Sequence, residues 1–284
     1  MINPYASIVA LCSLWVVAEC AHSARRRTVF RTVEDTRYDR SITTFSADGR
    51  LRQVEYGMEA SRRGNTIAAV KLSSETEKDC CFLIMPKTQD AVVHRIDAHV
   101  LMVATGYMGD GRFLASHIRQ KCRNHRLQFG EAPTVKQVAQ MVGAVQHLLT
   151  LIPGARPLGC VATVVGVEGT NTRLFQSGPG GVVEEYTFCT AGRGHESVLL
   201  KFEQEASQET LEKGSSWADV ATKIGNMVLD SYREEGKSGD EPELDIWTMS
   251  PCQGRRGSCH IQCAKSVSSS RLSSLVEELL NNII

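Results

Sequence analysis

One stretch of the chain carries residue types that occur in two functional motifs, a phosphate-binding loop and a zinc-binding helix. Residues 192–197 read GRGHES, with two glycines next to a His-Glu pair. A G-x-G-x-x-G loop would bind a dinucleotide phosphate, but its third glycine position holds Ser197. A zinc-protease helix needs H-E-x-x-H, and His195-Glu196 lacks the second histidine; no G-x-S-x-G nucleophile motif occurs either. The segment therefore predicts neither nucleotide binding nor hydrolysis.

A second group of potential ligands lies near the C-terminus: Cys252, Cys259, His260 and Cys263. Thiolates and imidazoles bind structural zinc, but such sites are built from C-x-x-C pairs, and none is present here. We therefore expect no metal site and no cofactor. Ordinary packing or exposure is expected of three histidines in predicted helices: His117, His125 and His147.

The chain has ten cysteines, which raises the question of disulfides. Cys80, Cys122, Cys160 and Cys189 each lie in an apolar run or on the apolar face of a predicted element. Because a free cysteine packs as a small hydrophobic side chain, a reduced interior is expected. The alternative is a secreted protein whose cysteines pair, and a count of free thiols in denaturant separates the two.

The length and the charge of the chain limit the classes of function that are possible. The 284 residues suffice for one large domain or two small ones with a sizeable core. The 32 basic residues balance the 32 acidic ones. This balance argues against electrostatic binding to nucleic acid or to an anionic membrane, and it is compatible with a subunit that buries surface in an assembly.

The first 23 residues resemble a targeting segment in part. Residues 8–18 form an apolar run followed by small residues, but no Lys or Arg precedes it and it is too short to span a bilayer comfortably. Three interpretations stay open: a start assigned too early, a true extension, and a cleaved signal peptide. We favour the first two.

Hydrophobic periodicity predicts alternating groups of strands and helices. In the first half we expect strands at 66–70, 80–85, 92–96 and 99–104, then helices at 110–129 and from Thr134, with a Thr134–Gln137 capping box, to Pro153. In the second half we expect strands at 160–167, 172–176 and 182–188, helices at 195–206 and 216–232, strands at 244–250 and 259–264, and a last helix at 272–280. This order implies two sheets packed face to face with helix layers outside.

These sheets are preceded by a predicted turn and helix. Ser46 and Asp48 can accept hydrogen bonds from the first N–H groups of a helix that begins near Gly49, and Gly64 falls where a left-handed C-terminal cap is expected. One apolar stripe follows from the spacing of Leu51, Val54 and Met58. The basic side chains are expected in solvent: Arg50, Arg52, Arg62 and Arg63. By spacing alone this is an ordinary surface helix.

The whole of this region reads YDRSITTFSADGRLRQVEYGMEASRRGNTIAAV over residues 38–70. It resembles the N-terminal signature of proteasome alpha-type subunits. Three later blocks are similar to family landmarks at similar spacing: RPLGC at 156–160, LFQSGPGG at 174–181 and GRG at 192–194. The resemblance implies an N-terminal extension at 1–37 and an alpha-type domain at 38–284. The fold it implies is α+β, a four-layer αββα sandwich of the Ntn-hydrolase-like proteasome subunit type.

The resemblance also implies site residues. Tyr38, Asp39 and Tyr56 match a cluster that steadies the open gate in this family, together with a turn at Ala47, where the family usually has proline. The helix stripe of Leu51, Val54 and Met58 matches the ring-contact helix. Lys87 is the candidate for the lysine that receives activator C-termini through a carboxylate–ammonium contact. The segment 71–95 is shorter than in relatives, and Gly178 replaces an aspartate.

Catalytic subunits of this fold use an N-terminal threonine, released by cleavage after glycine, whose own amine serves as base. Here Gly64 is followed by Asn65, Thr66 comes one place late, and the strand at 80–85 has no lysine. We therefore predict no catalytic residue. An active threonine-type hydrolase is the alternative, and an N-terminal sequence starting at Thr66 would support it.

The function implied by the resemblance is that of a non-catalytic alpha-type subunit of the 20S proteasome core. It would help to form the outer ring, gate substrate entry and dock regulatory particles in ubiquitin-dependent protein degradation. The expected partners are other alpha and beta subunits, in a heteroheptameric ring within a core of twenty-eight subunits, and a regulatory particle. Neither nucleic acid nor membrane is an expected partner, and the expected location is cytoplasm and nucleus.

Overall fold

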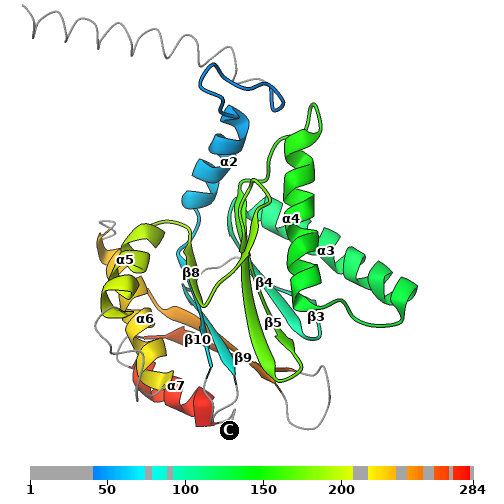
Figure 1. The fold of residues 1–284 in the computed structure, drawn as a ribbon. Coiled ribbons are helices and arrows are strands. Elements are labelled where there is room, and N and C mark those ends of the chain that lie inside the picture. Colours follow the sequence, from blue (N-terminus) through cyan, green and yellow to red (C-terminus); the bar gives the residue numbers. More distant parts are fainter. Residues whose placement is uncertain are drawn as a thin grey trace, which may run out of the picture.

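Two antiparallel sheets form the centre of the molecule (Figure 1) in a computed structural model that describes residues 41–73, 79–87, 92–206, 217–234, 242–251, 259–268 and 271–281. The first sheet has the order β10 (Cys259–Val267), β9 (Leu244–Pro251), β2 (Cys80–Pro86), β1 (Ile67–Leu72) and β8 (Phe188–Ala191). The second has the order β3 (Val93–Asp97), β4 (Val100–Gly106), β5 (Cys160–Glu168), β6 (Asn171–Ser177) and β7 (Val183–Glu185).

Helices cover the outer face of each sheet (Figure 1). The first sheet carries α5 (His195–Ala206), α6 (Trp217–Glu234) and α7 (Leu272–Asn281), and the second carries α3 (Met108–Phe129) and α4 (Val135–Leu151). The predicted capping box begins α4, because Gln137 N donates to Thr134 Oγ1 at 3.2 Å and Thr134 N donates to Gln137 Oε1 at 2.8 Å. The predicted four-layer αββα sandwich is thus confirmed.

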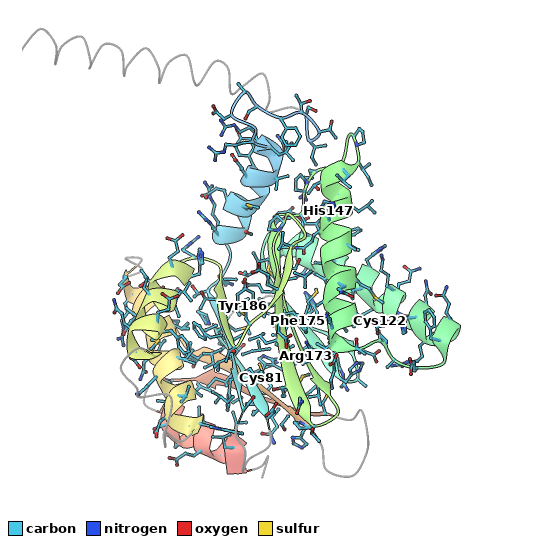
Figure 2. The ribbon with its side chains drawn as sticks, viewed as in Figure 1. Cys81, Cys122, His147, Arg173, Phe175 and Tyr186 are labelled. Atoms are coloured by element: carbon cyan, nitrogen blue, oxygen red, sulfur yellow. The ribbon has the colours of Figure 1, made fainter. Side chains whose placement is uncertain are left out.

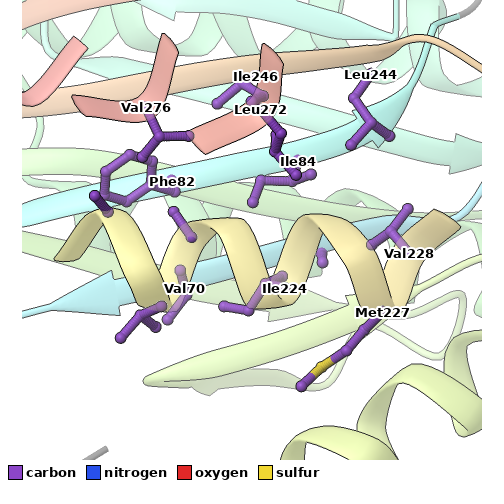
Figure 3. Close-up of a cluster of buried hydrophobic side chains, with 14 of the residues drawn as sticks. Val70, Phe82, Ile84, Ile224, Met227, Val228, Leu244, Ile246, Leu272 and Val276 are labelled. Carbon is purple, nitrogen blue, oxygen red and sulfur yellow. The ribbon is translucent and has the colours of Figure 1, made fainter. Parts of the chain in front are cut away.

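Strand β2 shows why the layers form. It is buried along its whole length, so both of its faces must be covered. Phe82 and Ile84 face the helices and pack against Ile224 of α6 and Val276 of α7 (Figure 3). Leu83, the intervening residue, belongs to the core between the two sheets. The apolar run with two covered faces fits the inner position that β2 has at the centre of the first sheet.

The predicted single strand at 182–188 is wrong. The structure has two short strands there, and they lie in different sheets: β7 pairs with β6, and β8 pairs with β1. The chain crosses between the sheets at Tyr186 and Thr187. Tyr186 N donates to Leu174 O at 2.9 Å in the second sheet, and Lys71 N donates to Thr187 O at 2.7 Å in the first. Hydrophobic periodicity cannot show such a crossing, because it does not indicate which sheet a strand joins.

Helix α2 (Arg52–Arg62) stands beyond the end of the sandwich (Figure 1). It begins later than predicted, since Leu51 is its N-cap and makes no side-chain capping bond. Ser46 Oγ accepts instead from Arg50 N at 3.1 Å, before the helix starts. The predicted left-handed cap at Gly64 is also wrong: the C-cap is Arg63, with φ −84°.

Arg52 departs from the expected solvated position. Its side chain is only 11% exposed and pairs with Glu55, whose Oε2 lies 3.2 Å from Arg52 Nη1. Three residues that carry predictions lie outside the described part of the chain, as do the 1–37 extension and the first position of the helix predicted at 216–232: Tyr38, Asp39 and Cys252.

Candidate functional site

The turn before α2 closes with alanine at the position where the family signature usually has proline. Gly49 N donates to Ser46 O at 2.8 Å, and Ser46 N donates to Arg50 O at 2.9 Å. Ala47 therefore occupies the second position of a hydrogen-bonded turn. Tyr56 is half exposed on α2, while Tyr38 and Asp39 lie outside the described residues, so the gate cluster stays a prediction.

Helix α2 presents apolar side chains away from its own domain. Its buried residues are Gly57 and Ser61, which face the sandwich. On the predicted stripe, Val54 is half buried and Met58 is 44% exposed, and the neighbouring Tyr56 is 47% exposed. The stripe is therefore only partly covered by this chain. Exposed apolar side chains on a projecting helix are typical of a surface that another protein covers.

A groove of about 380 Å³ lies beside α2. It is lined by Gln53, Tyr56, Gly57, Ala60, Tyr107, Arg156, Pro157 and Gly159. Sequence reasoning missed the interactions that shape this groove. Arg156 Nη1 and Nη2 each lie 2.6 Å from an oxygen of buried Asp110, and Gly159 N donates to the same carboxylate at 2.8 Å.

The Asp110 carboxylate therefore fixes one wall of the groove. Its hydrogen bonds to the Arg156 guanidinium raise the pKa of that arginine, so the cation is permanent. The guanidinium also lies 5.5 Å from the centroid of the Tyr107 ring. No sequence signal joins two residues 46 positions apart, although Arg156 belongs to the RPLGC block. Tyrosine and arginine held in place beside a groove are the residue types that dominate binding at protein interfaces.

The position of a potential nucleophile is closed. Thr66 is 3% exposed, and its Oγ1 donates to Arg193 O at 2.5 Å. Asn65 precedes it, and β2 contributes no lysine. The GRG stretch that resembled a phosphate loop is the turn between β8 and α5, and His195 Nδ1 lies 2.8 Å from Gly192 O. The two glycines of this stretch are part of that turn.

Lys87 follows β2 directly and already has a partner. Its Nζ lies 2.6 Å from Glu243 Oε2, and its backbone N donates to Glu243 O at 2.7 Å. Both side chains are about half exposed, so the ion pair is weak and open to competition. The activator-pocket assignment of Lys87 stays a prediction.

The cysteines of the described residues are free thiols. Five are buried: Cys80, Cys81, Cys122, Cys160 and Cys189. Cys81 lies between the two sheets and Cys122 on α3 (Figure 2). Cys259 and Cys263 on β10 are half buried. The burial pattern confirms that these side chains pack as small hydrophobic groups.

Other candidate ligands are dispersed. His117 stacks on Phe113 and His125 contacts Phe129, while His147 is exposed on α4 (Figure 2). Among the described residues, no group of three or more His, Cys, Asp or Glu side chains could hold a metal ion. In the same part of the chain, no helix is long and apolar enough to cross a membrane.

Comparison with known proteins links this arrangement to one family. A family model described as "Proteasome subunit" matches residues 82–237, and a second model, for the N-terminal signature of A-type proteasome subunits, matches residues 38–60. The chain is 32% identical over 203 residues to the alpha type-7 proteasome subunit of Caenorhabditis elegans, covering 68% of this chain and 78% of the relative. It is 30% identical over 227 residues to the alpha proteasome subunit of Methanoregula boonei, covering 77% and 90%.

Proposed function

Since the chain belongs to the alpha-type subunits of the 20S proteasome, we propose that it acts as a non-catalytic subunit of the outer ring. In this role it gates substrate entry, docks regulatory particles and serves ubiquitin-dependent protein degradation. Its partners are other proteasome subunits: alpha subunits in a heteroheptameric ring, beta subunits stacked beneath, and a regulatory particle. Its proposed location is the cytoplasm and nucleus.

The observation that carries the ring role is the surface of α2. Tyr56 and Met58 are exposed, and the adjacent groove offers Tyr107 and an Arg156 guanidinium held by Asp110. A projecting helix with apolar side chains beside a preformed groove that contains a fixed guanidinium suits a neighbouring subunit. We propose that Leu51, Val54 and Met58 contact this neighbour.

Catalytic silence is supported by the environment of Thr66. A terminal-threonine mechanism needs a free amine and an exposed hydroxyl on one residue. Here the hydroxyl is buried and bonded to Arg193 O, and Asn65 occupies the place that would follow the cleaved glycine. We propose that proteolysis belongs to the beta subunits.

Gating and docking are supported less directly. The turn at Ala47 is closed and places the start of α2, to which residues 1–40 are joined through this turn. Lys87 is a half-exposed ammonium whose ion pair with Glu243 an incoming carboxylate could replace. We propose that the N-terminal segment contributes to the gate and that Lys87 receives an activator C-terminus.

The ring contact is tested with Val54→Asp, which places a charge on the α2 stripe. We expect the variant to fold but to fail to co-sediment with the 20S particle, because an unpaired carboxylate is costly to bury in an interface. The matched control is Leu200→Asp, which adds the same charge at a 57%-exposed side chain on α5. Normal co-sedimentation of the Val54→Asp chain would contradict the proposed contact.

A further inference from the structure

The link between α2 and β1, residues 64–66, is held from both sheets. Arg193 N, just past β8 of the first sheet, donates to Gly64 O at 2.8 Å. Thr105 Oγ1 on β4 of the second sheet donates to Asn65 O at 2.5 Å. Thr66 Oγ1 donates back to Arg193 O at 2.5 Å. Two successive carbonyls of this link are thus bound by groups from opposite layers of the sandwich.

The same link is packed backbone to backbone. A Cβ added to Gly64 would lie 2.1 Å from Gly106 N, and one added to Gly192 would lie 2.1 Å from Asn65 O. Such distances leave no room for a side chain at either glycine. The link is therefore enclosed by the ends of β4 and β8.

Helix α2 also packs on its own domain along one face, where a Cβ added to Gly57 would lie 3.2 Å from Pro157 Cβ and 3.5 Å from Pro179 Cβ. Its buried residues are Gly57 and Ser61, and the Ser61 hydroxyl donates to Met58 O within the same helix. Its C-terminal end receives one further bond, from Arg193 Nη2 to Arg63 O at 3.3 Å. The direction in which α2 projects therefore depends both on this packed face and on the link that follows it.

We propose that Thr66 and Thr105 are positioning residues that clamp residues 64–66 and so aim α2 at its neighbour. In a catalytic subunit of this fold, the nucleophile would stand at the position of Asn65. Here the next residue, Thr66, holds the backbone in place instead. The value of this clamp to the assembly rests on the proposed function of α2 as the ring-contact helix. The clamp itself is a property of the isolated chain.

Hydrogen exchange of the full-length chain tests the clamp. Thr66→Val and Thr105→Val keep the side-chain shape and remove one hydroxyl each. In each we expect the α2 amides 55–62 to exchange roughly tenfold faster, while the amides of β2 and β9 keep their protection. Thr66→Ser, which retains a hydroxyl, should restore slow exchange. The matched control is Thr190→Val, which removes the 3.1 Å bond from Thr190 Oγ1 to His195 O at the start of α5.

The outcomes are distinct. Unchanged α2 exchange in both valine variants, or equal loosening in Thr190→Val, would overturn the clamp. Faster α2 exchange together with lost ring incorporation supports both the clamp and the role of α2. Faster α2 exchange with normal incorporation would support the clamp and contradict α2 as the contact helix, which is a failure of the proposed function alone.

Discussion

At the scale of single residues, the buried thiols illustrate how burial sets chemistry. Burial raises the pKa of the Cys80, Cys160 and Cys189 thiols to about 12, from an ordinary value of 9.0. The thiolate is the reactive form, so these groups are inert at neutral pH. They contribute to the fold as apolar volume rather than as redox or metal-binding groups.

The raised thiol pKa values predict a loss of stability at alkaline pH. Between pH 9 and 12 the unfolded chain releases thiol protons that the folded chain keeps, so the free energy of unfolding falls as pH rises. Below pH 8 these thiols contribute no pH dependence. From pH 8 to pH 10 we expect a loss of roughly 1 kcal/mol per buried thiol.

Urea unfolding at both pH values measures this loss in the wild-type chain, in Cys189→Ala and in the half-buried control Cys259→Ala. The Cys189→Ala chain should lose roughly 1 kcal/mol less than wild type between the two pH values. An equal loss in wild type and Cys189→Ala would show that this thiol titrates normally in the folded chain.

Residue-scale predictions succeeded where a residue type dictates its environment. Cysteines in apolar runs were expected inside, and they are buried. The Asp110–Arg156 pair was missed because pairing depends on the fold: the two side chains meet only after α3 packs beside the chain segment that precedes β5. The Thr66–Arg193 bond, between residues 127 apart, was inaccessible for the same reason.

At the scale of elements, local sequence signals predict where most helices lie along the chain. They do not predict how each element joins the sandwich. The Thr134 capping box predicted the start of α4 correctly, since all of its partners lie within one turn. The start of α2 was wrong because Ser46 caps the preceding turn instead. The strand at 182–188 was wrong because the chain leaves one sheet for the other at Tyr186, which period-two patterning cannot indicate.

The turn before α2 gives a prediction at this scale. Ala47 is the second residue of the turn from Ser46 to Gly49, a position that favours proline. Ala47→Pro should raise the free energy of unfolding by about 0.4–1 kcal/mol, because proline restricts the unfolded chain. Urea unfolding measures the change, with Ala47→Gly as a control expected to shift it the other way. A destabilised Ala47→Pro chain would show that the turn has a geometry closed to proline.

At the scale of the whole molecule, the order of the elements is compatible with two sheets between helix layers, and the family resemblance implied the four-layer arrangement itself. The structure agrees because inner strands such as β2 must be covered on both faces. Neither periodicity nor composition could predict that α2 stands outside these layers with Tyr56 and Met58 exposed. That feature depends on contacts that form only in the fold, namely the packing of Gly57 against Pro157 and Pro179 and the hydrogen bonds to the link at 64–66.

At the same scale, net charge and surface shape bear on how the chain would recognise other proteasome subunits. Its charges balance, so long-range attraction does not select a partner, and contact must come from shape and local chemistry. The α2 surface and its groove supply both on one side of the molecule. In the isolated subunit the α2 surface and its groove are exposed. We expect a neighbouring subunit to bury them in the proposed ring.

Mass spectrometry of intact 20S particles purified from cells that express this chain tests the central claim most directly. The account predicts peptides of this chain in the particle, in amounts comparable to those of the other alpha subunits. Peptides from 24–37 and 71–95 in the same digest would show that these two segments are present in the assembled protein. Expression of the chain with none of its peptides in the purified particle would contradict its role as a subunit of the core.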